Sequence, residues 1–250
     1  MRKKEVLLFL MMGTLMLSGC NAKTEKNTQQ NTESSNTVST SVTEIDTSEM
    51  FSERDKEVGY EEAESTVILL ADNGFSCESD AVSITENTVT IKDEGTYILS
   101  GSLSNGMVIV EAEDTDKIQL VLNGVSISNT QSAALYIRSA DKVFVTTASG
   151  TENILENNGT YTAIDENNID AAVFSKSDLT FNGEGTLTIT TQEGHGIVSK
   201  DELVLTSGTY VITSEVMGFQ GKTVSALLMV LITLYQEKME FMQKIQRTAV

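Results

Sequence analysis

The stretch that decides the fold is DAAVFSKSDLTFNGEGTLTITTQEGHGIVSKDELVLTSGTYVITSEVMGFQGK, residues 170–222. It states the same pattern three times, the third time incompletely. A Gly-Thr-x-x-Ile-Thr phrase begins at Gly185 and again at Gly208. Apolar and polar residues alternate within each copy, and Gly or Asn separates the short runs, which is the pattern of β-strands joined by turns.

Equivalent residues recur at steps of 22 to 24 positions, as Lys176, Lys200 and Lys222 do. A unit of this length with two or three short strands is typical of one turn of a parallel β-helix. Looser copies occupy residues 106–128 and 133–155. Each turn buries its inward side chains only against its neighbours, so the copies must come in series. The pattern therefore predicts an all-β solenoid over residues 65–222.

The front of the chain predicts export. Residues 1–19 have a basic start and an apolar run, which is the form of a secretory signal. The ending Leu-Ser-Gly-Cys resembles the bacterial lipoprotein box, in which the cysteine, here Cys20, is lipidated. Residues 20–64 are rich in Ser, Thr, Asn, Gln and Glu and predict a disordered tether, although a short helix within residues 53–64 is an alternative. We expect anchoring on the outer face of a bacterial cytoplasmic membrane, with the domain exposed at the cell surface.

The net charge of the chain restricts the kinds of ligand that it can be expected to bind. The chain has a formal net charge of -19. Binding to nucleic acid requires a basic surface that neutralises phosphates, so nucleic acid is excluded as an expected partner. Polysaccharide, cations or a basic protein fit the composition better. A complete solenoid would need no partner subunit, so we expect a monomer if the coil is complete.

Four phrases carry a resemblance to a known family: DKIQLVLNGVSIS (116–128), TENIL (151–155), AAVFSKSDLTFNGEGTLTIT (171–190) and GIVSKDELVLTSGTYVIT (196–213). In order and spacing they resemble the clostridial β-helix family that binds cellulose and acidic sugars. The resemblance covers about residues 72–222. It implies a calcium-carrying, right-handed parallel β-helix, similar in shape to pectate lyases, that binds polysaccharide. At two corners where that family has Asp-Gly-Ile, this chain has His195-Gly196-Ile197 and Met217-Gly218-Phe219.

An insertion between residues 155 and 170 interrupts the repeat and concentrates oxygen ligands. Calcium takes six to eight oxygen ligands in irregular geometry, so a calcium site is predicted here. The alternative is a solvated acidic loop. The residues proposed as metal ligands are Asp165, Glu166, Asn167, Asn168 and Asp170. A second, weaker candidate comprises Glu113, Asp114 and Asp116.

The candidate carbohydrate-binding residues are Lys176, Lys200 and Lys222, with Tyr161 from the insertion as an aromatic platform. Stacked strands place equivalent side chains about 4.8 Å apart. A row of ammonium groups could therefore receive the carboxylates of a uronate chain. The alternative is a ladder of salt bridges with the nearby carboxylates of Asp178, Asp201 and Glu202.

The function we predict is binding of cellulosic or acidic (uronate) polysaccharide, with calcium assistance and no catalytic residues. A calcium-dependent polysaccharide lyase is the first alternative, but Arg138 is the only arginine of the repeat region and no basic residue falls inside the acidic insertion. The single histidine, His195, has no partners at the spacing of a catalytic triad. A structural β-solenoid adhesin that recognises protein is the second alternative.

Residues 223–250 break the pattern, because they contain no Gly, Asn or Asp. Their periodicity permits a helix over about residues 226–246. One interpretation is a helix that caps the open end of the solenoid. Another comes from the genetic code: in a shifted reading frame, the methionine codons at Met229 and Met239 force glycines at the repeat spacing. The tail is then an aberrant product of a one-base frameshift that truncates the solenoid.

Overall fold

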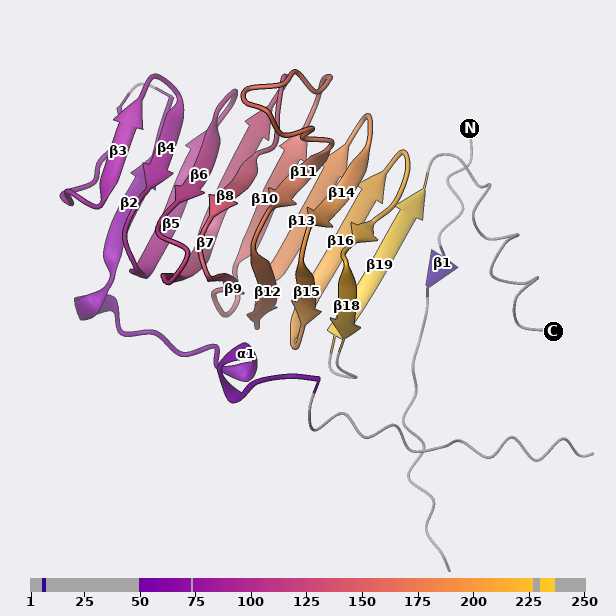
Figure 1. The fold of residues 1–250 in the computed structure, drawn as a ribbon, viewed down its shortest axis with the longest axis horizontal. Coiled ribbons are helices and arrows are strands. Elements are labelled where there is room, and N and C mark those ends of the chain that lie inside the picture. Colours follow the sequence, from indigo (N-terminus) through magenta and orange to yellow (C-terminus); the bar gives the residue numbers. More distant parts are fainter. Residues whose placement is uncertain (1–5, 8–49, 73, 227–229, 237–250) are drawn as a thin grey trace, which may run out of the picture.

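We describe the protein from a computed structural model, in which the described residues are 6–7, 50–72, 74–226 and 230–236. They form two β-sheets, which run side by side along the length of the body (Figure 1). The strands of the larger sheet are β1 (Val6–Leu7), β2 (Thr66–Leu70), β5 (Gly95–Leu103), β7 (Lys117–Asn129), β9 (Lys142–Thr147), β10 (Glu152–Asn157), β12 (Asp178–Gly183), β13 (Thr186–Thr191), β15 (Glu202–Leu205), β16 (Gly208–Ser214), β18 (Thr223–Ala226) and β19 (Val230–Gln236). The strands of the second are β3 (Val82–Thr85), β4 (Thr88–Ile91), β6 (Met107–Glu111), β8 (Leu135–Ser139), β11 (Ala171–Ser175), β14 (His195–Ser199) and β17 (Phe219–Gln220).

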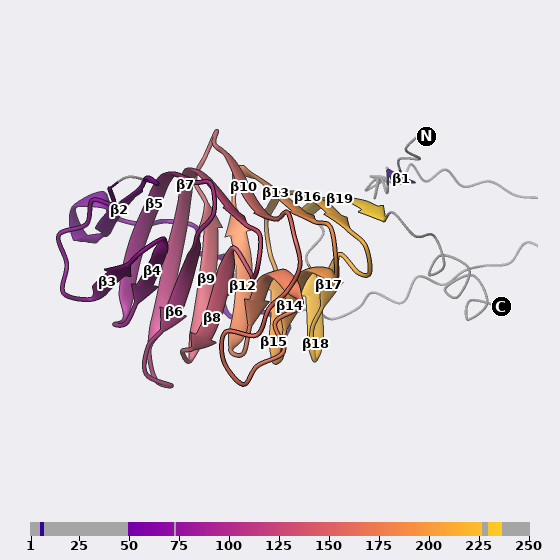
Figure 2. The same cartoon turned by 90° about the horizontal axis from the view of Figure 1, so that it is seen from above.

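The larger sheet bends at β7 and so has two arms. Residues 117–122 of β7 pair with β9, and residues 126–129 pair with β10. Gly124 lies at the bend with a φ of 74°, and Asn153 accepts hydrogen bonds there from the backbone N–H groups of Gly124 and Val125, at 2.9 and 3.0 Å. β5 is bent in the same way at Gly101. Figure 2 shows the two arms as separate rows, β10, β13 and β16 in one and β12, β15 and β18 in the other.

The copies of the repeat lie beside one another in parallel. Thr186 pairs with Thr209 and Leu187 with Tyr210, which sets the two Gly-Thr-x-x-Ile-Thr phrases in register. The side chains that alternate inward from the two arms and the second sheet make one apolar core, in which the rings of Phe181 and Tyr210 meet edge to face at 5.9 Å. Alternation with a period of two therefore sets which residues are buried.

The predicted fold class, a right-handed parallel β-helix, is wrong. A regular solenoid has separate turns, whereas here β5 and β7 run through the bend without interruption, so the two arms are one folded sheet, like half of a barrel. The second sheet is mixed, because β3 and β4 form an antiparallel hairpin. The glycines at the bends explain the difference, since a backbone with positive φ turns within a strand without ending it.

The predicted helical tail is also wrong where the structure describes it. Residues 223–226 and 230–236 form strands β18 and β19, which pair in parallel with β15 and β16. The run Val-Leu-Ile-Thr-Leu is rich in β-branched residues, and an open sheet edge supplies hydrogen-bond partners, so pairing prevails over a helical period. Residues 237–250 lie outside the described residues, and the frameshift stays a hypothesis about the gene.

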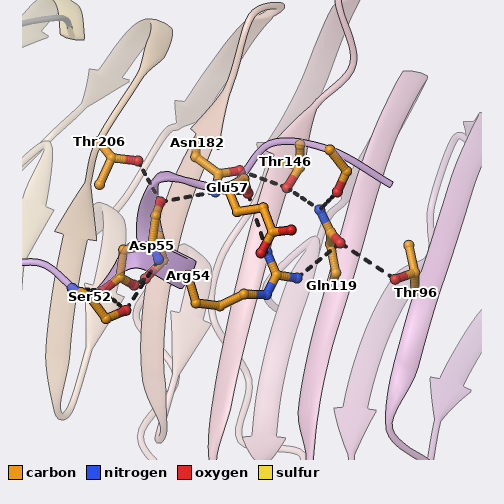
Figure 3. Close-up of polar contacts among 11 residues, drawn as sticks. Ser52, Arg54, Asp55, Glu57, Thr96, Gln119, Thr146, Asn182 and Thr206 are labelled. Carbon is orange, nitrogen blue, oxygen red and sulfur yellow. Dashed lines mark hydrogen bonds and ion pairs between the residues drawn. The ribbon is translucent and has the colours of Figure 1, made fainter. Parts of the chain in front are cut away.

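Residues 50–60, which we call the strap, cross the outer surface of the arm made by β7, β9, β12 and β15 (Figure 3). The helix α1 (Glu53–Lys56) lies within it, and a short 3-10 turn follows at Glu62–Glu64. Asp55 of the helix is only 2% exposed, and Phe51 is buried as well. The predicted tether therefore extends too far, because residues 50–64 are part of the folded body.

Acid should affect the strap through Asp55. Burial by itself would raise the pKa of this carboxyl group, but hydrogen bonds from Lys142, Thr180 and Ser52 outweigh burial and lower the pKa from 3.8 to about 2. Because the folded pKa lies below the unfolded one, the charged carboxylate stabilises the docked strap fully above about pH 4, and this contribution is lost as the pH falls through about 2. We expect an NMR titration of the Asp55 carboxyl carbon to have a midpoint near 2. A midpoint at the ordinary value of 3.8 would contradict the buried ion pair.

Candidate functional site

Four basic side chains occupy equivalent positions at one corner of the body. β11 pairs with β14 and β8 so that Ser175 lies opposite Ser199 and Ile137. The residue after each of these strand positions is therefore Arg138, Lys176 or Lys200, and Lys222 follows at the next step, two residues after β17. We call Arg138, Lys176, Lys200 and Lys222 the basic column. It contains the three predicted lysines and one arginine that the repeat had not revealed.

Arg138 is held in place by its neighbours. Its guanidinium donates to Asp165 at 3.2 Å and to Glu111 at 3.1 Å, and it lies 5.4 Å from the centre of the Tyr136 ring. Burial by itself would lower the pKa of Arg138, but the hydrogen bond with Glu111 contributes to a net rise. The group is therefore a permanent cation with a fixed orientation.

Lys176 is the member of the basic column that is available to a ligand. Its side chain is exposed, and none of the described residues makes an ion pair with it. Two adjoining cavities, of about 320 and 470 Å³, share Lys176 and Arg138 in their walls. The first also contains Asp141, Asp178 and Asp201, and the second contains Ile164 and Glu166. Lys176 thus lies where the two cavities meet, and together the cavities form an open groove.

The other two lysines have partners. The ammonium of Lys200 lies 5.0 Å from the centre of the Phe174 ring, and that of Lys222 is 3.3 Å from a carboxylate oxygen of Asp201. The pair between Lys222 and Asp201 matches the salt-bridge alternative. Surface pairs of this kind contribute at most about 1 kcal/mol, so a stronger ligand could displace them.

The insertion between β10 and β11, the long loop at the top of Figure 1, covers the outer face of the second sheet. Its residues Ile169 and Tyr161 pack on an apolar cluster that includes Tyr136, Phe174 and Val198. The hydroxyl group of Tyr161 hydrogen-bonds with Thr191 at 2.8 Å, and burial raises its pKa. The predicted sugar platform is therefore half-buried and serves to anchor the loop.

Asp165 organises the insertion from within. Its carboxylate accepts hydrogen bonds from the Tyr136 hydroxyl at 2.8 Å and the Asn167 backbone N–H at 2.8 Å, in addition to Arg138. Burial alone would raise the pKa of Asp165, but the hydrogen bonds from Asn167 and Tyr136 outweigh it and lower the pKa. Burial and the bond with Asp165 together raise the pKa of Tyr136 to about 12. The carboxylate is thus ionised, and four donor groups from Tyr136, Arg138 and Asn167 already bond to it.

The other predicted calcium ligands are spread along the loop. Glu166 and Asn168 are exposed, and Asn167 bonds to Asp165 and Tyr136. One carboxylate oxygen of Asp170 is buried without a hydrogen-bond partner. Within residues 50–72, 74–226 and 230–236, the structure contains no group of three or more His, Cys, Asp and Glu side chains placed to hold a metal ion. A calcium ion would therefore need amide or backbone oxygens, a rearranged loop, or oxygens from the ligand.

One further sequence prediction concerns the membrane. Cys20, the predicted lipidation site, lies outside the described residues. Among the helices that the structure describes, none is long and apolar enough to cross a bilayer.

The repeat period did not align Arg138 with the three lysines. The insertion lies between Arg138 and Lys176, so their separation in sequence exceeds the usual step of 22 to 24 residues. The register of β8 and β11 supplies the missing alignment. The available signal was the Ala-Ala-Val-Phe-Ser-Lys phrase, which matches Ala-Ala-Leu-Tyr-Ile-Arg at residues 133–138 position by position.

Comparison with known proteins gives three findings. A family model described as "Carbohydrate-binding domain-containing protein" matches residues 85–231, more than half of the chain. A protein of the same description from Acetivibrio thermocellus is 35% identical over 135 residues, which are 53% of this chain and 47% of that protein. This chain thus spans about half the length of that curated relative. The solved structure of the polysaccharide lyase-like protein from C. thermocellum, a gadolinium derivative, is similar with a TM-score of 0.59 and 27% identity, covering 65% of this chain and 79% of that one.

Proposed function

Because the chain belongs to the family of carbohydrate-binding domain-containing proteins, we propose that it binds an acidic, uronate-containing polysaccharide at the basic column. The observation that carries the proposal is Lys176, an exposed cation without an ion-pair partner in the described part of the chain, at the junction of two cavities. Arg138 beside it is oriented in advance. Hydrogen bonds between such cations and carboxylates are among the strongest in proteins, so two adjacent cations suit a ligand with repeated carboxylates.

Calcium is part of this proposal. The net charge of -19 repels a polyanion, and the basic column offsets this repulsion only locally. A calcium ion bridging Glu166 or Asn168 to a uronate carboxylate would remove the conflict, because calcium readily shares oxygen ligands between two partners. Both side chains are exposed, and Glu166 lines the same cavity as Lys176, which supports this role.

Replacing Lys176 tests the site. We expect Lys176→Met to weaken binding to a soluble oligogalacturonate about tenfold, the loss expected for one charge-assisted contact of about 1.5 kcal/mol. Isothermal titration calorimetry measures the effect. Lys92→Met, which removes an equal charge from an exposed position outside the groove, is the control and should leave the affinity unchanged.

The comparison of the two variants distinguishes a site at Lys176 from an effect of net charge. Equal losses in the two variants would indicate an effect of net charge and not a site at Lys176. Repeating the titration with a chelator addresses calcium: unchanged affinity would remove calcium from the proposal. Binding to insoluble cellulose in place of the oligogalacturonate would redirect it to neutral glycans, and failure to bind any glycan would favour a protein-binding adhesin.

A lyase is the second candidate, because the similar solved structure is called polysaccharide lyase-like. An arginine that removes the sugar C5 proton must first lose its own proton. Arg138 is a poor base, since the ion pairs with Glu111 and Asp165 favour its charged form. We therefore favour binding without cleavage. Release of unsaturated, ultraviolet-absorbing product from polygalacturonate would overturn this choice.

The cellular location that we propose is the outer face of a bacterial cytoplasmic membrane, through a lipid on Cys20. The signal-like residues 1–19 and the polar residues that follow support it. Labelling with a fatty acid in a bacterial host, compared between the chain and a Cys20→Ser variant, distinguishes a lipidated cysteine from a signal that is cleaved without lipidation.

A further inference from the structure

The buried sheet surface beneath the strap has an apolar part and a polar part. Ile98, Val121 and Ala148 form the apolar part, on which Tyr60 of the strap packs. The other side chains that point outward from β5, β7, β9, β12 and β15 are mostly hydroxyl, amide or charged groups, with Phe144 and Val204 among them. We define the polar face by eight of these residues: Thr96, Gln119, Lys142, Phe144, Thr146, Thr180, Asn182 and Thr206. Gln119, Asn182 and Thr206 are at most 4% exposed.

The polar face is oriented by its own hydrogen bonds. Gln119 donates to Thr146 at 3.0 Å, and Thr146 donates to the amide oxygen of Asn182 at 2.6 Å. Because the amide oxygen of Asn182 accepts from Thr146, its NH₂ group points outward. The outward NH₂ group then donates only to the strap, to the carbonyl oxygens of Asp55 at 3.1 Å and Glu57 at 3.0 Å. The donor is therefore arranged for an acceptor that lies on the sheet, not within it.

The strap fills this surface with a carboxylate, carbonyl oxygens and a flat cation. The carboxylate of Asp55 accepts from Thr180 at 2.6 Å and from Lys142 at 2.9 Å (Figure 3 shows the neighbouring contacts). The Asp55 carbonyl also accepts from Thr206 at 2.7 Å. The central carbon of the Arg54 guanidinium lies over the Phe144 ring, 4.4 Å from its centre.

These contacts match the chemistry of a uronate sugar. Such a sugar offers a carboxylate, several oxygens that accept hydrogen bonds, and a face of C–H groups that packs on an aromatic ring. The polar face offers a lysine with a hydroxyl group, outward amide donors and the ring of Phe144. A surface evolved only to be covered could be apolar throughout, as it is at Ile98 and Val121, because apolar side chains cost less to bury than polar groups.

We propose that the polar face is a second binding subsite for acidic glycan, and that the strap is an intramolecular competitor in which the Asp55 carboxylate occupies the place of a uronate carboxylate. This inference rests on the proposed function for its ligand class but assigns a different surface. Only the corner formed by Ser139, Ala140 and Asp141 separates Arg138 of the basic column from Lys142 of the polar face along the chain. One polyuronate chain passing round that corner would meet both.

Releasing the strap tests the proposal. Asp55→Ala in the full chain removes the carboxylate and leaves every residue of the sheet unchanged; Arg54→Ala/Asp55→Ala is a second variant in case one change is too small. We expect either to raise the affinity for trigalacturonate about tenfold, which is the gain if the strap covers the polar face about nine-tenths of the time. Limited trypsin cleavage after Lys56 should accelerate in both variants, and circular dichroism should remain that of the wild type.

Combining Asp55→Ala with a second substitution shows which surface causes the rise in affinity. It should persist in Lys176→Met, because the basic column is not involved, and it should vanish in Lys142→Met, because the group that receives the carboxylate is gone. A strap that is cleaved faster with no change in affinity would overturn the inference, and so would a strap that stays resistant to trypsin in both variants. If the wild type binds through Lys176 and release of the strap adds nothing, only this inference fails. The opposite result is also possible. If the wild type does not bind, but the strap variants bind equally well with and without Lys176→Met, the proposal at the basic column fails instead.

Discussion

Gly183→Ala is expected to lower the free energy of unfolding by about 4 kcal/mol, since a left-handed backbone costs about 1–2 kcal/mol for an L-residue and overpacking adds about 1–3 kcal/mol. Gly183 ends β12 with a φ of 121°, and a Cβ atom there would lie 2.3 Å from the carbonyl oxygen and 2.5 Å from the backbone nitrogen of Thr147. Both contacts are with the backbone of the paired strand β9, so no side-chain rotation relieves them. The strands would have to separate.

A glycine that also has a positive φ, but with free space around it, provides the control. Gly124 has a φ of 74°, and no atom lies within 4 Å of the point where a Cβ atom would stand. Gly124→Ala should therefore cost only the backbone contribution of about 1–2 kcal/mol. Urea unfolding followed by circular dichroism measures both variants, with the slope of the transition checked for equality. Similar losses in the two would mean that strand β12 does not approach β9 as closely as the structure indicates.

The second large effect is expected at the bend of β7. Asn153→Leu should cost about 3 kcal/mol, because it leaves two backbone N–H groups without a partner at about 1–3 kcal/mol each. Asn153 is 1% exposed, and its amide oxygen accepts from Gly124 and Val125 while its NH₂ group donates to the Thr186 carbonyl at 3.2 Å. The Asn153 side chain thus connects the bend of β7 to β13 by hydrogen bonds, and its replacement should destabilise both arms of the larger sheet.

Asn158→Leu is the matched control for this change. Asn158 is exposed and makes one side-chain bond, to the Ser128 hydroxyl at 3.0 Å. Its replacement should cost less than about 1 kcal/mol. Hydrogen exchange adds a local measurement: the amides of Gly124 and Val125 should exchange faster in Asn153→Leu than in the control. Unchanged protection of these amides would show that another group satisfies the bend.

Several features of the candidate site could be predicted from the sequence. The step of 22 to 24 residues aligns Lys176, Lys200 and Lys222, and the pairing of β11, β14 and β17 places them at successive positions. The resemblance to a carbohydrate-binding family is confirmed by the family model that matches residues 85–231. The partners of the lysines could not be predicted, because Phe174 and Asp201 meet them through side-chain packing that periodicity does not encode.

The insertion, where the sequence predicted a calcium site, shows the same limit. Composition revealed a density of carboxylate and amide oxygens, but not that Asp165 would turn inward to Tyr136 and Arg138. An acidic side chain in a loop is equally compatible with a metal ion, with solvent or with a buried cation. The choice depends on which donors lie nearby after folding.

By itself, the sequence determined that the protein is built of short parallel strands whose copies stack in register, because alternation of apolar and polar residues fixes which side of each strand is buried, and a constant step fixes which residues align. Three features became apparent only in the folded molecule: the strands form a folded sheet and a mixed sheet, residues 230–236 continue as a strand, and the strap covers the polar face. Each of these depends on contacts between distant segments, such as Asp55 with Thr180 and Lys142. The free energy of such contacts exists only when both segments are in place, so no local pattern can reveal it.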